Sequence, residues 1–435
     1  MIMNIIRYPD KSEWADIIKR PVKSRENLDE IVNGVLKDVK LNGDSAVRKY
    51  ELKFDNIQLN RLDVSDDELE HADDLVDNNL KEAILHAYRN IKKFHSEQVF
   101  KSNCIETDNG IKCWQKALPI QKVGLYIPGG TAPLFSTVLM LATPAQIAGC
   151  NEVVLCSPPD RNGNINPAVL FAAKISGVKK IYKIGGVQAI AAMAYGTETV
   201  PKVYKIFGPG NQYVMAAKQA VSVQDVAIDM PAGPSEVAVV ADKTSNPIFV
   251  AADLLSQAEH GADSQVLLLS DDENVLMAVK EETEKLLMEL PRRAIAEGAL
   301  DNSSFLLVHN LEEAMSIVNE YAPEHLILAV DKPEEWTDKV LNAGSVFLGH
   351  FSCESAGDYA SGTNHTLPTN GYAKAYSGVS LDSFVKKISF QQLSEQGIKS
   401  IANTVEIMAH NEMLYAHENA MKVRREYLFN LDNDK

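Results

Sequence analysis

The chain of 435 residues lacks the long apolar runs and leader sequences that mark membrane or exported proteins. Its most apolar stretch, from Leu134 to Ala148, is interrupted by Ser136, Thr137 and Pro144. A helix of this length and composition is too short and too broken to cross a bilayer. The first ten residues contain no cationic start followed by an apolar run, so no signal peptide is predicted. We therefore expect a cytoplasmic protein without membrane contact.

Cysteine is also scarce. The five cysteines are odd in number, scattered and never spaced as Cys-x-x-Cys: Cys104, Cys113, Cys150, Cys156 and Cys353. This distribution favours a reducing compartment over a disulfide framework, and it contains no cysteine-based metal motif. Basic residues are also outnumbered. The chain has 43 Lys and Arg residues and 59 Asp and Glu residues, which gives a net charge of -16. Nonspecific nucleic-acid binding needs a basic surface, so no nucleic-acid partner is expected.

What is present is an alternation of short apolar runs with segments of helix length. The runs are 123–127, 153–156, 181–184 and 203–207, followed by 237–241, 266–269, 305–308, 326–330 and 346–348. Such alternation predicts an α/β fold with parallel sheets and helices on both faces. The two series suggest a duplicated α/β unit. Hydrophobic content of 45% and charged content of 23% are ordinary for a globular protein of two to four domains.

The two ends of the chain have different patterns. Residues 10–95 show helical periodicity, with Leu28, Val32 and Val35 on one expected face together with Ile31, Leu36 and Val39. Asp108-Asn-Gly110 lies between two strand-like runs, 100–107 and 111–117, and predicts a hairpin because Asn-Gly suits a tight turn. Residues 350–371 are polar and rich in small residues, which predicts a loop, and residues 394–426 read as helix.

Three glycine-rich turns follow expected strands of the first series, at Pro128 to Gly130, at Gly185-Gly186 and at Gly208 to Asn211. Backbone amides in such turns can approach a ligand beyond the carboxyl ends of the strands. None completes Gly-x-Gly-x-x-Gly, because Tyr213 occupies the third glycine position after Gly208 and Gly210. A standard dinucleotide fingerprint is therefore absent, and each turn taken alone is as well explained by structure.

Glu324 and His325 stand side by side in an otherwise apolar stretch, where a helix pattern ends and a strand pattern begins. A histidine can take and return protons near neutral pH, and a buried carboxylate beside it can activate water. The alternative is a strand start with two solvated polar residues. Further polar pairs are Gln257 with His260, Asp358 with His365, and Glu412 with His417. Each of these, taken singly, is better explained as polar residues at the protein surface.

Together these segments resemble histidinol dehydrogenase. The resemblance extends from the N-terminal helices to about residue 425, over the segments around Tyr126, Asn211, Ser235, Gln257, Glu324 and Asp358. It implies an oxidoreductase of histidine biosynthesis that oxidises L-histidinol to L-histidine with two NAD molecules, through a bound aldehyde. It also implies two related, incomplete Rossmann-like domains with small terminal pieces, in a homodimer. The corresponding boundaries are 1–121 (N-terminal helices and hairpin), 122–234, 235–371 and 372–435 (C-terminal helical tail).

The resemblance assigns roles to particular residues. It implies a zinc site, which could hold manganese in cells, with the ligands Gln257, His260, Asp358 and His417. Glu324 and His325 would be the catalytic acid-base pair. NAD would contact Tyr126, Gln188 and Asn211. Substrate would contact the metal ligands, the catalytic pair, and Ser235, His365 and Glu412. Residues matching Glu412 and His417 reach across to the partner's site in this family.

On this basis we hypothesise that His325 removes the alcohol proton as the first hydride leaves, and that Glu324 then activates water to hydrate the aldehyde. A different mechanism would trap the aldehyde on a thiolate of Cys113 or Cys150, although no adjacent basic motif activates either thiol. Two other function classes use the same residues. One is a zinc hydrolase of small amides, in which a metal and Glu324 activate water. The other is a non-catalytic ligand-binding protein.

Overall fold

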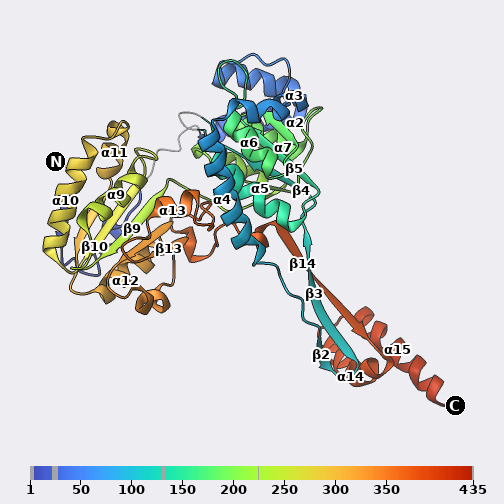
Figure 1. Cartoon of the computed structure of the whole chain (residues 1–435). Coiled ribbons are helices and arrows are strands. Elements are labelled where there is room, and N and C mark those ends of the chain that lie inside the picture. Colours follow the sequence, from blue (N-terminus) through green and yellow to red (C-terminus); the bar gives the residue numbers. More distant parts are fainter. Residues whose placement is uncertain (1–3, 22–27, 130–132, 224, 434–435) are drawn as a thin grey trace. The chain divides into compact units, whose positions relative to one another are not determined.

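The computed structural model describes residues 4–21, 28–129, 133–223 and 225–433. The chain forms two compact units (Figure 1). The first contains Met1–Gln98 and Ile120–Phe384, and the second contains Val99–Pro119 and Val385–Lys435. Each unit therefore combines segments that are distant in the sequence.

The first unit contains a five-stranded parallel sheet in the order β6-β5-β4-β7-β8. Its strands are β4 (Lys122–Tyr126), β5 (Glu152–Ser157), β6 (Lys180–Lys183), β7 (Lys205–Phe207) and β8 (Ala227–Ile228). The helices between them are α5 (Phe135–Ala148), α6 (Pro167–Ile175), α7 (Gly186–Tyr195) and α8 (Gln212–Ser222). The chain leaves β4 toward β5 and later returns to the other side of β4 with β7, so the order reverses between β4 and β7. Ligands in open α/β sheets bind at such a reversal.

A second, six-stranded parallel sheet has the order β1-β11-β10-β9-β12-β13. Its strands are β1 (Asn4–Arg7), β9 (Glu236–Ala241), β10 (Gln265–Ser270), β11 (Ser304–Leu307), β12 (His325–Ala329) and β13 (Ser345–Leu348). They alternate with α9 (Pro247–Ala258), α10 (Glu273–Leu287), α11 (Arg293–Leu300), α12 (Leu311–Tyr321) and the 3-10 helix η3 (Pro333–Lys339). Every predicted strand run of both series overlaps one of these strands. The edge strand β1 was not predicted.

Helices α1 (Trp14–Ile17), α2 (Leu28–Tyr50), α3 (Asp66–Glu70) and α4 (Asn78–Ser96) make up the N-terminal part, with the π-helix η1 (Glu51–Asp55) and the 3-10 helix η2 (His71–Leu75). Helix α2 buries the predicted face except at Ile31, which is 42% exposed. Its buried side chains pack in one core with α7, α8 and strand β5 of the first sheet. This packing brings η1, at the end of α2, to the first sheet.

The second unit is a three-stranded antiparallel sheet with two helices. Strands β2 (Ile105–Asp108) and β3 (Ile111–Pro119) form the predicted hairpin, and β14 (Val385–Leu393) pairs with β3 along its whole length. Helices α14 (Glu395–Asn411) and α15 (Tyr415–Asn433) follow (Figure 1). The expected C-terminal helical tail over 372–435 contains these two helices, and β14 and the 3-10 turns η4 (Tyr372–Lys374) and η5 (Leu381–Phe384) precede them.

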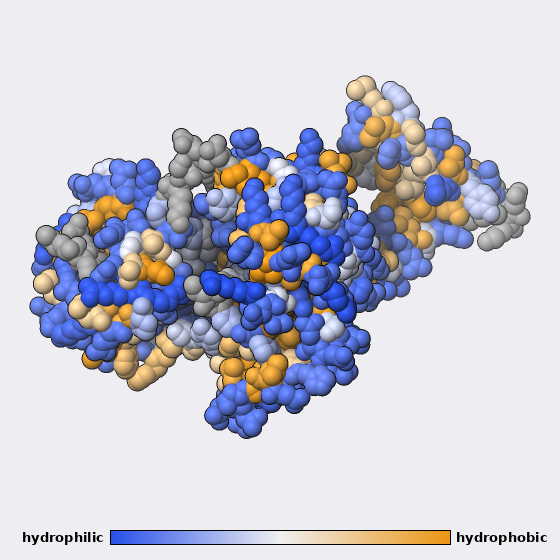
Figure 2. All heavy atoms as spheres, turned by 90° about the horizontal axis from the view of Figure 1, so that it is seen from above, coloured by the Kyte–Doolittle hydropathy of each residue, from blue (hydrophilic) through white to orange (hydrophobic). Residues whose placement is uncertain are grey.

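The polar segment after β13 also differs from its prediction. Within it, residues Glu354–Tyr359 form the short helix α13. Asp358 therefore lies on a helix and not in a loop, whereas His365 does lie in the loop that follows. No helix of the described residues has the length and apolar composition needed to cross a membrane. The face seen in Figure 2 is largely hydrophilic, with apolar side chains in separate small groups.

Candidate active site

Glu324 and His325 lie at the amino end of β12. Helix α12 ends at Tyr321, Ala322 adopts a left-handed conformation, and the chain enters the sheet at His325. Strand β12 lies between β9 and β13, and all five of its residues are buried. Glu324 and His325 are only 6% and 4% exposed. The alternative of a solvated strand start is therefore wrong.

Three carboxylates surround the His325 ring. Its Nδ1 atom lies 3.8 Å from Glu324 and 3.9 Å from Glu354, and its Nε2 atom lies 3.5 Å from Asp358. Neither ring nitrogen makes a hydrogen bond within the described part of the chain. The imidazole is thus enclosed by acidic groups, and both of its nitrogens are buried.

Burial and mutual charge shift the pKa values of this group. Burial alone would lower the pKa of His325, but the carboxylates of Glu354 and Glu324, with that of Asp358, raise it to about 10. Burial raises the pKa of Glu324 to about 8, although the positive charge of His325 opposes this. Burial likewise raises the pKa of Glu354 to about 8. Groups shifted in this way are typical of proton-transfer sites.

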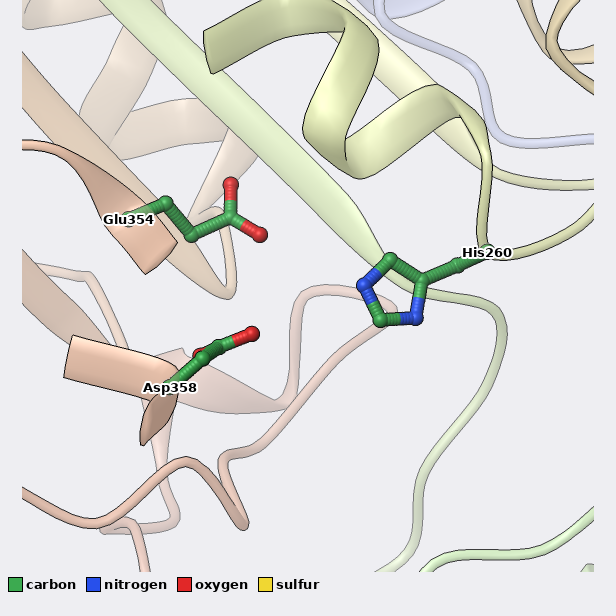
Figure 3. A group of neighbouring side chains, drawn as sticks. All are labelled: His260, Glu354 and Asp358. Carbon is green, nitrogen blue, oxygen red and sulfur yellow. The ribbon is translucent and has the colours of Figure 1, made fainter. Parts of the chain in front are cut away.

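Three side chains of this region can share a metal ion. The ligand atoms of His260, Glu354 and Asp358 all lie within 4.8 Å of one another (Figure 3). Glu354 and Asp358 are spaced i, i+4 on α13, so one face of that helix presents both carboxylates. His260 approaches from the segment after α9, where its N–H donates to the Gln257 carbonyl at 3.3 Å. One imidazole and two carboxylates form a donor set that zinc accepts.

Gln257 lies in the last turn of α9 and is completely buried. In the orientation that satisfies its neighbours, its amide nitrogen donates to both oxygens of Glu354 and its oxygen accepts from the Glu236 backbone N–H at 2.9 Å. The same N–H donates to Glu324 at 3.1 Å. Gln257 and Glu324 therefore both contact the start of β9, and Glu354 is joined to it through Gln257.

Glu354 was not predicted as a site residue. Its spacing of four from Asp358 is the signal that could have identified it, but the small residues around it favoured a loop, in which that spacing has no meaning. His365 lies next to Asp358. Its Nδ1 atom is 2.9 Å from the Asp358 carbonyl and its Nε2 atom is 3.1 Å from the Thr137 hydroxyl. Because a carbonyl only accepts, Nδ1 carries the proton and Nε2 accepts from Thr137.

The three residues expected to contact NAD lie elsewhere in the first unit, whereas Ser235 adjoins Glu236 at the start of β9. Ser235 immediately precedes β9 and is partly buried. Tyr126 ends β4, and its hydroxyl accepts from the Gly186 N–H at 3.1 Å. Gln188 is completely buried in α7 and donates to Glu51 at 2.8 Å. Asn211 caps α8 by accepting from the N–H groups of its second and third residues.

These positions follow the carboxyl ends of the first sheet, where the glycine turns were predicted. Gly208 has φ +122°, and a Cβ there would lie 2.0 Å from the Tyr126 carbonyl oxygen. The buried ion pair of Lys218 and Asp229 holds this turn in place. Asp229 accepts from the Gly208 N–H at 2.8 Å, and Lys218 donates to the Gly208 carbonyl at 2.7 Å. Gly130, in the first glycine turn, lies outside the described residues.

Two predicted site residues belong to the second unit. Glu412 is the residue at the end of α14, His417 lies in the first turn of α15, and both side chains are exposed. The cysteines give no support to a thiolate mechanism. Burial raises the pKa of the Cys150 thiol to about 12, which disfavours its reactive form. Cys113 lies on β3 of the second unit.

Comparison with known proteins decides the family. A sequence model described as histidinol dehydrogenase matches residues 18–425 of the chain. This chain belongs to the histidinol dehydrogenase family. The resemblance predicted from the sequence is therefore confirmed, and so is the α/β fold with parallel sheets.

Close relatives cover almost the whole chain. The histidinol dehydrogenase of Bacteroides thetaiotaomicron is 60% identical over 423 residues, 97% of this chain and 99% of its own length. That of Campylobacter jejuni is 48% identical over 98% of this chain and all of its own length. The crystal structure of histidinol dehydrogenase from Elizabethkingia anophelis is 56% identical, covers 98% of both chains and superposes with a TM-score of 0.96.

Proposed function

We propose that this chain oxidises L-histidinol to L-histidine with two NAD molecules, through bound L-histidinal, in the last steps of histidine biosynthesis. The observation that carries the proposal is the position of His325, which is buried among three carboxylates beside a set of metal-ligating atoms. The overall reaction consumes one water, transfers two hydrides to NAD and releases three protons. A site with buried groups that take and give protons suits this balance.

The residues present fit a zinc ion, because His260 and Asp358 offer a nitrogen and an oxygen ligand within a few ångströms of each other. We propose Gln257 and His417 as the further ligands. To ligate, Gln257 would have to present its amide oxygen and release Glu354. A bound zinc ion would supply an anchor for the imidazole and amine of histidinol, and orientation of this kind can contribute about 7–11 kcal/mol at best. Manganese is the alternative ion.

His325 and Glu324 divide the proton transfers in this proposal. His325 takes the alcohol proton in the first oxidation and a proton of the hydrated aldehyde in the second. Glu324 deprotonates the water that adds to the aldehyde, for which its raised pKa of about 8 makes it a competent base once ionised. A divalent cation near Asp358 would offset the negative charge of the carboxylates around His325. This favours the neutral imidazole, which can act as a base. Ser235, His365 and Glu412 would contact substrate.

NAD would bind at the carboxyl ends of the first sheet, against Tyr126, Gln188 and Asn211. The support is the reversal of strand order between β4 and β7, the close-packed Gly208 turn and the amino end of α8. NAD accepts the two hydrides in turn. A nucleotide at this edge would need no Gly-x-Gly-x-x-Gly, since the turns at Gly185-Gly186 and at Gly208 would allow the close backbone approach.

We also propose a homodimer in the cytoplasm, in which Glu412 and His417 complete the site of the partner subunit. The support is the exposure of both side chains on the second unit, together with exposed apolar residues on α14, on α15 and in the turn between them: Ile407, Met408, Met413, Leu414, Tyr415, Val423, Tyr427 and Phe429. Exposed apolar groups of this kind mark association surfaces.

One assay separates the proposal from its rivals. Purified protein is mixed with NAD and histidinol, and NADH absorbance is followed before and after treatment with a chelator. Formation of NADH that is lost on chelation supports a metal-dependent dehydrogenase. Absence of NADH, with hydrolysis of small amides instead, would support the zinc hydrolase that the same residues allow. Absence of any turnover would support the third possibility, a non-catalytic ligand-binding protein.

A further inference from the structure

Asp55 is an acidic residue with no assigned role at the edge of the first sheet. It ends η1, is partly buried, and has no hydrogen-bond or ion-pair partner among the residues that the structure describes. Its Oδ2 atom lies 3.5 Å from the position that a Cβ on Gly185 would take, and that Cβ would also lie 2.7 Å from Pro158. Asp55 therefore lies where the turns after β5 and β6 meet.

This location has a defined use in dinucleotide-binding sheets. There, an acidic residue after the second strand accepts hydrogen bonds from the adenosine ribose. The equivalent strand here is β5, the neighbour of β4, and the only acidic residue in the segment 158–179 is Asp160. Its Oδ1 atom already accepts from the N–H groups of Asn162 at 2.9 Å and Asn164 at 2.8 Å. Asp160 thus stabilises the turn in its own loop.

The groups around Asp55 include the residues proposed to contact NAD. Glu51, one turn earlier on η1, accepts from the Gly185 N–H at 3.0 Å and from Gln188 at 2.8 Å. The Tyr126 hydroxyl binds the Gly186 N–H in the same turn. Glu51 is completely buried, whereas Asp55 reaches solvent. Of the two η1 carboxylates, Asp55 is therefore the one that a bound nucleotide can contact.

Cationic side chains line a cavity that includes Asn56, the residue after Asp55. A cavity of about 380 Å³ begins at Asn56 and is also lined by Arg61, Arg161 and Lys183. Arg61 and Lys183 are paired with Asp63 and Glu68 at 2.6 and 2.5 Å. These cations would attract a phosphate on the adenosine ribose, which an ionised Asp55 would repel.

We propose that Asp55 accepts a hydrogen bond from the adenosine ribose of the dinucleotide and so selects NAD over NADP. The inference rests on the proposed function, to which it adds a residue that determines nucleotide specificity. The acid is supplied by η1 and not by the loop after β5, whose Asp160 is engaged in its own turn.

The test compares Asp55→Asn with Asp66→Asn, a matched loss of charge at an exposed position on α3. Binding of NADH to the purified, metal-loaded enzyme is followed by fluorescence titration. We expect Asp55→Asn to weaken NADH binding by about tenfold and to shift the kcat/KM ratio toward NADP by at least as much, as the loss of a charged hydrogen bond implies. Metal content and the KM for histidinol should not change. Asp55→Glu, which restores the charge at a shifted position, should fall between.

Unchanged NADH affinity and an unchanged NAD to NADP ratio in Asp55→Asn would overturn the inference while the proposed function stands. Failure of the wild-type chain to oxidise histidinol would overturn the proposed function instead. The titration with NADH does not depend on turnover, so it still decides the role of Asp55 in that case. Equal weakening in Asp55→Asn and Asp66→Asn would reduce the effect to overall charge and would also overturn the inference.

Discussion

The Nε2 atom of His325 lies 3.5 Å from Oδ1 of Asp358, although one residue begins a strand and the other lies on a helix three elements later. This contact places the proposed proton-transfer group next to a proposed metal ligand. His325 is the proposed proton carrier and Asp358 a proposed metal ligand. A change at either residue therefore acts on the other through charge, and variants must be compared by readouts that separate metal binding from proton transfer.

Loss of the Glu324 carboxylate should slow the two half-reactions to different extents. Glu324→Gln keeps the size of the side chain and removes its ability to deprotonate water, so we expect oxidation of histidinal to fall about 10²–10⁴-fold and oxidation of histidinol to fall less. Each half-reaction is followed separately by NADH formation from the alcohol or the aldehyde. The exposed Glu281→Gln serves as the control. Equal losses in both half-reactions would contradict the division of roles between Glu324 and His325.

Removal of metal should abolish activity reversibly. After chelation we expect no turnover until zinc or manganese is returned, and the ion that restores more activity at its cellular concentration identifies the native metal. Asp358→Asn should weaken zinc binding by about tenfold or more, measured by competition with a chromophoric chelator. The exposed Asp338→Asn should bind zinc as the wild type does. Wild-type affinity in Asp358→Asn would remove Asp358 from the ligand set.

Sites shared between subunits should show complementation. His325→Asn and His417→Asn homodimers should each be inactive, but mixing after mild dissociation should form hybrids with one intact site. Random reassociation gives about a quarter of wild-type activity, because half of the dimers are hybrids with one working site each. The activity of the mixture and its molecular mass by light scattering are the measurements. No recovery in a mixture that demonstrably exchanges subunits would place His417 in the site of its own chain or outside any site.

The buried Glu51 should make stability depend on pH. Burial raises the pKa of Glu51 from 4.5 to about 7, although hydrogen bonds from Gln188 and Gly185 oppose the shift. A folded chain that binds this proton more tightly than the unfolded chain loses stability as pH rises from about 4.5 to 7, by about 3 kcal/mol in all.

Glu51→Gln keeps the accepting oxygen and cannot ionise, so it should match the wild type at about pH 4.5 and be more stable at about pH 8. Thermal unfolding of both proteins at the two pH values is the measurement. A wild-type midpoint that equals or exceeds that of Glu51→Gln at the higher pH would show that Glu51 is not held in its neutral form.

Much of the fold was predictable because short, buried, parallel strands have a distinctive apolar pattern. Residues 237–241 and 326–330 were recognised for that reason and form β9 and β12. Strand β14 was missed because it lies in an exposed sheet, alternates only weakly and carries two lysines. Strand β1 was missed because four residues at a sheet edge give too short a pattern. Helix α13 was missed because its small residues favour turns.

The candidate site was predictable as single residues but not as an arrangement. Glu324 and His325 were conspicuous as adjacent polar groups in an apolar stretch. Nothing in the sequence indicates that Glu354 approaches both Gln257 and His325, because that depends on how α13 and α9 meet at the start of β9. The position of Asp55 beside Gly185 likewise depends on the packing of α2 and η1 against the first sheet. Long-range contacts of this kind appear only in the folded chain.

The most direct test of the proposed function is the stoichiometry of NADH formed per histidinol consumed. With limiting histidinol and excess NAD, we expect two NADH and one histidine for each histidinol, without free histidinal in solution, and no NADH after chelation. One NADH per histidinol with release of the aldehyde, or no NADH at all, would contradict a four-electron oxidation at this site.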